Sequence, residues 1–181
     1  MAHALAEHYA EPPWHAIYVS PLRRAYQTGE IIAGRCHCPM IVDDGLLELD
    51  YGRWDHLRQT VVVDTPEYVA WRANPAAFAP PGGETAEAVA RRASTSLEQI
   101  RRRYPEDDVL VVTHKATIRI LVCHYLGIET RWFKDRIACP VGSMTSICFS
   151  HTGPMLMQLA DVAHLPLEWR ANADNAGGAG P

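Results

Sequence analysis

The sequence predicts an α/β fold with a mostly parallel β-sheet, because short apolar runs of the β type alternate along the chain with helical patterns. The continuous apolar run Val109–Val112 is typical of a strand that is buried on both faces. Directly after Thr113-His114, apolar residues recur at helical spacing. A chain of 181 residues suits one domain, which we expect to comprise residues 1–170.

The first strand is expected at Ala16–Val19, with a helix directly after it. Ser20 is a favoured N-cap residue and Pro21 is favoured at the first helical position, so this helix should begin there. It should run to about Ala33, with Gly34 as the stop signal. Thr85 precedes a second helix, whose apolar face should consist of Ala86, Val89, Ala93, Leu97 and Ile100.

The second half of the chain continues the alternation. The helix after His114 should place Ile118, Leu121, Val122 and Tyr125 on one face and end at Gly127. Two β-type stretches follow at 144–149 and 155–159, separated by a Gly153-Pro154 turn. Residues 171–181 lack apolar periodicity, so we expect a disordered tail there.

Composition excludes several classes of protein. Apolar residues make up 48% and charged residues 21%, as in ordinary globular proteins, and the net charge of −4 speaks against a nucleic-acid partner. No stretch approaches the roughly 20 apolar residues of a membrane span, and the N-terminal residues show no secretory signal. We therefore expect a cytoplasmic protein with no membrane partner.

The five cysteines are an odd number without the spacing of a disulfide framework, so we expect free thiols in a reducing compartment. Cys36-His37-Cys38 has the form of a metal-binding fragment. Alternate side chains of an extended segment point to opposite faces, however, and no second ligand pair follows at zinc spacing. We expect neither a metal nor a cofactor.

Two predicted strand-to-helix junctions carry polar residues where open α/β sheets bind ligands. They are Ser20-Pro21-Leu22-Arg23-Arg24 and Thr113-His114-Lys115. An arginine in the first turn of a helix opposes the helix dipole, and a bound phosphate would offset that cost. A solvated side chain is the simpler interpretation for either arginine alone. Its position alone does not decide the role of His114. The side chain could reach a ligand-binding cleft, or it could be hydrogen-bonded to a backbone carbonyl as part of the core.

Five short segments carry a more specific pattern. They are SPLRRAYQT at 20–28, LLELDYGRW at 46–54, PGGET at 81–85, VVTH at 111–114 and DVAHL at 161–165. In this order they resemble motifs of the histidine phosphatase superfamily, also called phosphoglycerate mutase-like. The resemblance covers about residues 4 to 165. It implies a three-layer fold with helices on both faces of the sheet.

The resemblance also implies a pocket of two histidines, two arginines and a carboxylic acid, in which one histidine attacks phosphorus. Matched residue by residue, Arg24 would clamp the phosphate and His114 would hold and polarise it, beside Ser20 and Lys115. Glu48 would be the general acid that protonates the leaving oxygen. The substrate would be a small phosphorylated metabolite or another anionic molecule. Residues in 57–80 would cover it, although core packing is the commoner fate of apolar residues such as Val62, Tyr68, Trp71 and Phe78.

The family's Arg-His-Gly motif, with its nucleophilic histidine, occurs nowhere in this sequence. We therefore expect the family's first strand to be missing. Either the start is truncated and the natural protein is a phosphatase, or the protein lacks this element and has lost or changed its activity. Under both explanations this chain should be impaired as a phosphatase, because no correctly placed nucleophile exists.

Two other functions stay open. One is a non-catalytic interaction module, a pseudoenzyme that keeps a pocket for phosphate or another anion. The other is an acid/base enzyme of the dehydratase or isomerase type that uses Glu48 and His114. A missing central strand would also expose the edge of Val109–Val112, which predicts a homodimer that covers it.

Overall fold

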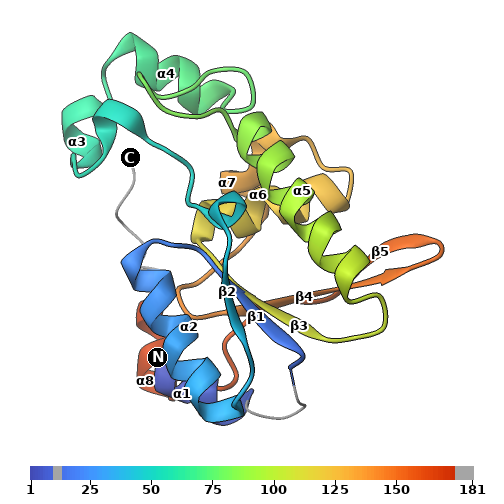
Figure 1. The fold of residues 1–181 in the computed structure, drawn as a ribbon. Coiled ribbons are helices and arrows are strands. Elements are labelled where there is room, and N and C mark those ends of the chain that lie inside the picture. Colours follow the sequence, from blue (N-terminus) through green and yellow to red (C-terminus); the bar gives the residue numbers. More distant parts are fainter. Residues whose placement is uncertain (10–13, 174–181) are drawn as a thin grey trace.

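The computed structural model describes residues 1–9 and 14–173 of the chain, and its centre is a parallel three-stranded sheet (Figure 1). Strand β1 (Ala16–Val19) lies between β2 (Met40–Val42) and β3 (Val109–Val112). In the register, Ile17 of β1 is opposite Met40 of β2 and Leu110 of β3. All four β1 residues are buried, as expected for a central strand.

Helices cover both faces of this sheet. On one face, α1 (Ala2–His8) and α2 (Arg23–Cys36) contribute Leu5 and Ile32, which pack with Ile17. On the other face, α5 (Ala86–Arg103) contributes Ile100, which packs with Tyr18. Figure 1 shows α2 and α5 on opposite sides of the strands. The predicted three-layer α/β arrangement is confirmed.

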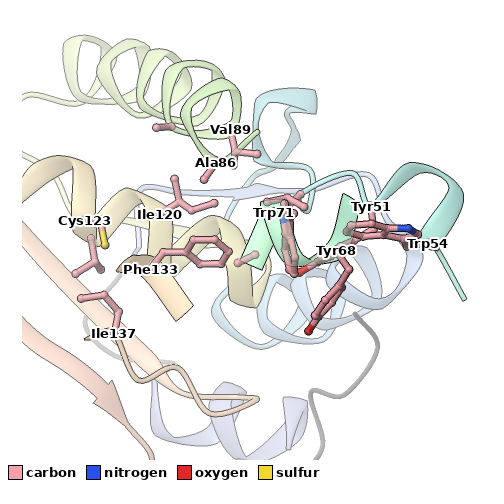
Figure 2. Close-up of a cluster of buried hydrophobic side chains, with 14 of the residues drawn as sticks. Tyr51, Trp54, Tyr68, Trp71, Ala86, Val89, Ile120, Cys123, Phe133 and Ile137 are labelled. Carbon is pink, nitrogen blue, oxygen red and sulfur yellow. The ribbon is translucent and has the colours of Figure 1, made fainter. Parts of the chain in front are cut away.

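A third apolar cluster joins the helices that follow β2 to those that follow β3. Its helices include α3 (Gln59–Val62), α4 (Pro66–Ala73), α6 (Lys115–Tyr125) and α7 (Phe133–Arg136). Three short 3₁₀ segments complete this part of the chain: η1 (Asp44–Leu46), η2 (Gly52–Trp54) and η3 (Thr130–Trp132). Trp71 and Phe133 are fully buried in the cluster (Figure 2).

The predicted bounds of α2 are wrong at both ends. The helix begins at Arg23 with Leu22 at the N-cap, because the hydroxyl of Ser20, which also bonds to His114, accepts from the N–H of Leu22 at 3.4 Å and not from a residue of the first turn. It also continues past Gly34 to Cys36. A glycine inside a helix costs about 1 kcal/mol relative to alanine, but residues on both sides of it, Ile32 and Cys36, pack in the same apolar cluster.

The prediction that Cys36 and Cys38 point to opposite faces is also wrong. His37, the C-cap residue of α2, adopts the left-handed conformation with φ 53° and ψ 33°. The chain is therefore not extended between the two cysteines, and their Sγ atoms lie 2.9 Å apart.

The other predicted helix boundaries are confirmed. Thr85 caps α5, and its hydroxyl oxygen accepts a hydrogen bond from the backbone N–H of Ala88 at 3.1 Å. Helix α6 begins directly after His114, its N-cap residue, and Gly127 follows its end with a φ of 67°. Within the described ranges, no helix has the length and apolar character needed to cross a membrane.

The strand β3 is less buried than its apolar sequence predicts. Only Leu110 is fully buried, because β3 pairs with β1 along one edge and has no other strand partner among the described residues. Strands β4 (Met144–Ser150) and β5 (Gly153–Asp161) form a separate antiparallel hairpin, which projects from the molecule in Figure 1.

The last described element is α8 (Leu167–Ala173). The sequence predicts a disordered tail from residue 171, but residues 171–173 belong to this helix. A helix can continue for one more turn without apolar periodicity. The rest of that predicted tail, 174–181, lies outside the described residues.

Candidate functional site

Ser20 and His114 meet at the carboxyl ends of β1 and β3. Parallel pairing of Val19 with Val112 brings the residues after both strands together, and the N–H of Ser20 donates to the carbonyl of Val112 at 3.0 Å. The hydroxyl of Ser20 then lies 2.7 Å from Nε2 of His114. Ser20 is 0% exposed and His114 5% exposed. Backbone pairing and burial together fix the position of the imidazole.

His114 is neutral at pH 7 in this environment. Burial, followed by the positive charges of Arg24 and Arg92, lowers its pKa from 6.5 to about 3. A neutral imidazole has one N–H donor and one acceptor nitrogen. The positive charges of Arg24 and Arg92 disfavour a proton on the ring, and the same charges attract an anion to the space beside His114.

Glu48 lies at the N-terminus of α6, directly beside the backbone of His114. Its carboxylate accepts hydrogen bonds from the backbone N–H groups of Ala116 at 3.4 Å and Thr117 at 3.2 Å. The hydroxyl of Thr117 donates to the same carboxylate at 3.3 Å, and the N–H of Leu49 donates at 3.0 Å. These groups include helix N-terminal donors, which attract negative charge. The acid predicted from the motif therefore shares a helix end with the predicted histidine.

Arg92 of α5 holds the loop that carries Glu48. Its guanidinium donates to the backbone carbonyls of Gly45, Leu47 and Glu48, each at 2.9 Å. The same group binds both carboxylate oxygens of Glu84 at 2.9 and 2.8 Å. Partial burial raises the pKa of Glu84, but the hydrogen bonds and charge of Arg92 outweigh it, and the net pKa is lowered.

Sequence reasoning missed Arg92, which is one of several arginines in an amphipathic helix. Its partners come from residues 45–48 and 84, which only the folded chain brings together. The signal that could have identified it is Glu84, the acidic residue of the PGGET motif, which is half-buried in the structure and pairs with a basic side chain.

Arg24 and Lys115 occupy the first turns of the two helices that begin at this edge of the sheet. Arg24 is the second residue of α2, is exposed, and acts electrostatically on His114. Lys115 is the first residue of α6 and is half-buried. Arg23 is exposed beside Arg24, as expected for a solvated side chain.

The apolar residues considered as a substrate cover divide into two groups. Val62, Tyr68 and Trp71 are buried in the core cluster, whereas Phe78 is 51% exposed. Tyr68 and Trp71 pack ring against ring at 5.6 Å between centroids (Figure 2). Core packing is thus the role of the first three. In the described parts of the chain, no three His, Cys, Asp or Glu side chains cluster in a way that could hold a metal ion.

Several known proteins are similar to this chain in both sequence and fold. The histidine phosphatase superfamily (branch 1) matches residues 1–162. Phosphoserine phosphatase 1 of Hydrogenobacter thermophilus is 30% identical over 166 residues, which cover 91% of this chain and 78% of that protein. YhfR of Bacillus stearothermophilus superposes with a TM-score of 0.83 at 25% identity, covering 90% of this chain and 82% of that one.

A mycobacterial glucosyl-3-phosphoglycerate phosphatase, solved with VO3, superposes with a TM-score of 0.78 at 26% identity. The match covers 87% of this chain and 81% of that structure. The five motifs, the parallel sheet that ends in Ser20 and His114, and these comparisons agree, and the chain belongs to branch 1 of the histidine phosphatase superfamily.

Proposed function

We propose that Ser20, Arg24, His114 and Lys115 form a binding site for the phosphate group of a small phosphorylated metabolite. The observation that carries this proposal is the buried contact between Ser20 and His114 at the carboxyl ends of β1 and β3, where burial, and then the charges of Arg24 and Arg92, keep the imidazole neutral. Two helices begin at this place, and Arg24 and Lys115 lie in their first turns. Backbone donors and guanidinium groups are the usual ligands of phosphate in proteins.

Each residue has a distinct role in this proposal. Arg24 binds the phosphoryl oxygens, and His114 donates a hydrogen bond to them and polarises the phosphorus. Glu48 delivers the proton to the leaving oxygen of the ester. Hydrogen bonds from the backbone N–H groups of Ala116 and Thr117 hold its carboxylate beside the phosphate site.

Hydrolysis through a phosphohistidine needs a second histidine as the nucleophile, and the sequence contains no Arg-His-Gly motif to supply it. We therefore propose that this chain by itself binds phosphate monoesters and does not turn them over. The test is incubation of the chain with a chromogenic phosphate ester, and we expect no release of the chromophore. Turnover that His114→Ala abolishes would contradict the proposal.

Binding is tested separately, by thermal unfolding in the presence of inorganic phosphate. A ligand at 100 times its Kd stabilises a protein by about 2.7 kcal/mol, which gives a measurable rise in Tm. We expect this rise in the wild-type chain and its loss in Arg24→Ala. Arg23→Ala is the matched control, because Arg23 is the exposed neighbour in the same helical turn. An equal rise in all three proteins, or none in the wild type, would refute the assignment of Arg24.

The names of the relatives support a small phosphorylated metabolite as the ligand. One relative is a phosphoserine phosphatase and another is a glucosyl-3-phosphoglycerate phosphatase. Both names describe a phosphate monoester on a small organic molecule.

The five cysteines are free thiols, which supports a reducing, cytoplasmic environment.

We also propose that two copies of this chain associate through β3. One edge of β3 pairs with β1, and no strand among the described residues lies along the other edge. An open strand edge presents unpaired N–H and C=O groups that readily pair with another strand. Val109 and Val111 are only half-buried there.

A further inference from the structure

Cys36 and Cys38 form a close pair of thiols at the end of α2, far along that helix from Arg24. Their Sγ atoms lie 2.9 Å apart. The thiol of Cys36 also contacts the backbone carbonyl of Ile32, one turn earlier, at 3.0 Å. His37 between them has the left-handed conformation that folds the two side chains onto the same side.

Two thiols this close suit either a metal ion or a disulfide. A zinc site needs four ligands, and the described residues hold no group of three or more His, Cys, Asp or Glu side chains around one point. A disulfide needs only these two sulfurs, which would move from 2.9 Å to about 2.05 Å. Both residues are half-buried, so a small reagent can reach them.

We propose that Cys36 and Cys38 are a redox-active dithiol that forms a reversible intramolecular disulfide on reaction with a low-molecular-weight disulfide. The Cys36 thiolate attacks one sulfur of the reagent and expels the first small thiol. Cys38 then loses its proton and attacks Sγ of Cys36, which expels the second small thiol. Two protein thiols are oxidised and one reagent disulfide is reduced to two thiols, so atoms and electrons balance.

The order of the two attacks follows from the surroundings of the sulfurs. Burial, and then the hydrogen bond and charge of Cys36, raise the pKa of Cys38 to about 12. Cys38 therefore keeps its proton while Cys36 reacts, and it can donate a hydrogen bond to the Cys36 thiolate. Closing a ring of two nearly adjacent residues strains the product, and strained disulfides are the easily reduced ones.

The positions of the arginines make this pair simple to follow by mass spectrometry. Trypsin cleaves after Arg35 and Arg53, so peptide 36–53 contains these two cysteines and no others. Peptide 137–170 contains Cys139 and Cys148 and serves as an internal control with the same number of thiols. The folded chain is incubated with glutathione disulfide, blocked with an alkylating reagent and digested.

We expect more than half of peptide 36–53 to be two hydrogen atoms lighter and unalkylated, and excess dithiothreitol to restore it. Peptide 137–170 should keep two alkylated thiols or carry glutathione on the exposed Cys148. If peptide 36–53 keeps both alkyl groups, or carries only glutathione adducts, the proposal is overturned.

Variants of His37 test the geometry while both cysteines stay in place. His37→Gly favours the left-handed conformation, whereas the β-branched residue in His37→Val opposes it. Disulfide formation should be retained in His37→Gly and fall severalfold in His37→Val, with circular dichroism confirming that both variants are folded. Equal oxidation of the two folded variants would contradict the role assigned to the backbone turn.

Discussion

His114 is the residue whose chemistry depends most on its surroundings. Its pKa is lowered to about 3 by burial and by Arg24 and Arg92. Because the unfolded histidine takes up a proton near pH 6.5 and the folded one does not, the stability that depends on His114 is fully present above pH 6.5. It is lost as the pH falls from about 6.5 towards about 3, by at most about 1.4 kcal/mol per pH unit.

An anion at the site should reverse this effect. We expect inorganic phosphate to raise the pKa of His114, because an anion next to the ring offsets the charges of Arg24 and Arg92. The measurement is an NMR titration of the imidazole carbon signals with and without phosphate. An unchanged titration at a phosphate concentration that raises Tm would place the anion elsewhere.

At the scale of elements, Arg92 fastens α5 to the loop that carries Glu48. Arg92→Lys keeps the charge but loses the planar fork that reaches Glu84 and the carbonyls of Gly45 and Leu47. Each carbonyl left without a donor costs about 1–3 kcal/mol, so we expect the free energy of unfolding to fall by roughly 2 kcal/mol.

Urea denaturation measures this loss, and Arg91→Lys is the control because Arg91 is an exposed neighbour on the same helix. A loss below about 0.5 kcal/mol in Arg92→Lys, the range of ordinary surface changes, would show that the loop does not depend on this guanidinium.

Two glycines should respond in opposite directions to alanine. A Cβ at Gly83 would lie 2.2 Å from the carbonyl oxygen of Asp50, so Gly83→Ala must push two backbone segments apart. A Cβ at Gly34 meets nothing within 4 Å, inside helix α2. We expect Gly83→Ala to lower Tm by several degrees and Gly34→Ala to raise the free energy of unfolding by about 0.5–1 kcal/mol. Calorimetry of both variants measures the contrast, and equal Tm values would contradict it.

At the scale of the whole molecule, the open edge of β3 predicts a dimer of about 40 kDa from chains of 20.2 kDa. Light scattering at micromolar concentration measures this mass. The carbonyl of Val112 accepts a hydrogen bond from Ser20, so the backbone of Val112 faces β1 and that of Val111 faces the open edge.

Proline lacks the N–H group, so Val111→Pro should remain folded and become monomeric, whereas Val112→Pro should lose the β1 pairing and unfold. A wild-type monomer with a cooperative melt would rule out the dimer.

Local patterns in the sequence predicted the parallel strands β1 and β3 and the helix that begins after His114, but they did not predict β2. They predicted these because strand burial, helix capping and apolar spacing act over a few residues. Ser20 shows the limit: it has the residue type of an N-cap, but its hydroxyl is committed to His114, 94 positions away. Arg92 was missed for the same reason, because its partners lie in a distant loop. The Cys36–Cys38 contact was missed for a local reason, because it depends on the left-handed conformation of the single residue His37.

The aromatic cluster in Figure 2 has a consequence for spectroscopy. The rings of Trp54 and Trp71 lie 5.6 Å apart at an interplanar angle of 77°, and Tyr51 and Tyr68 surround them. Fixed, asymmetric surroundings of aromatic rings produce near-ultraviolet circular dichroism, which vanishes when packing loosens while the backbone signal persists. The protein thus carries an intrinsic optical probe, whose signal includes the packing of the segment from η2 to α4. Loosening of aromatic packing can be followed without a label, separately from loss of the backbone signal.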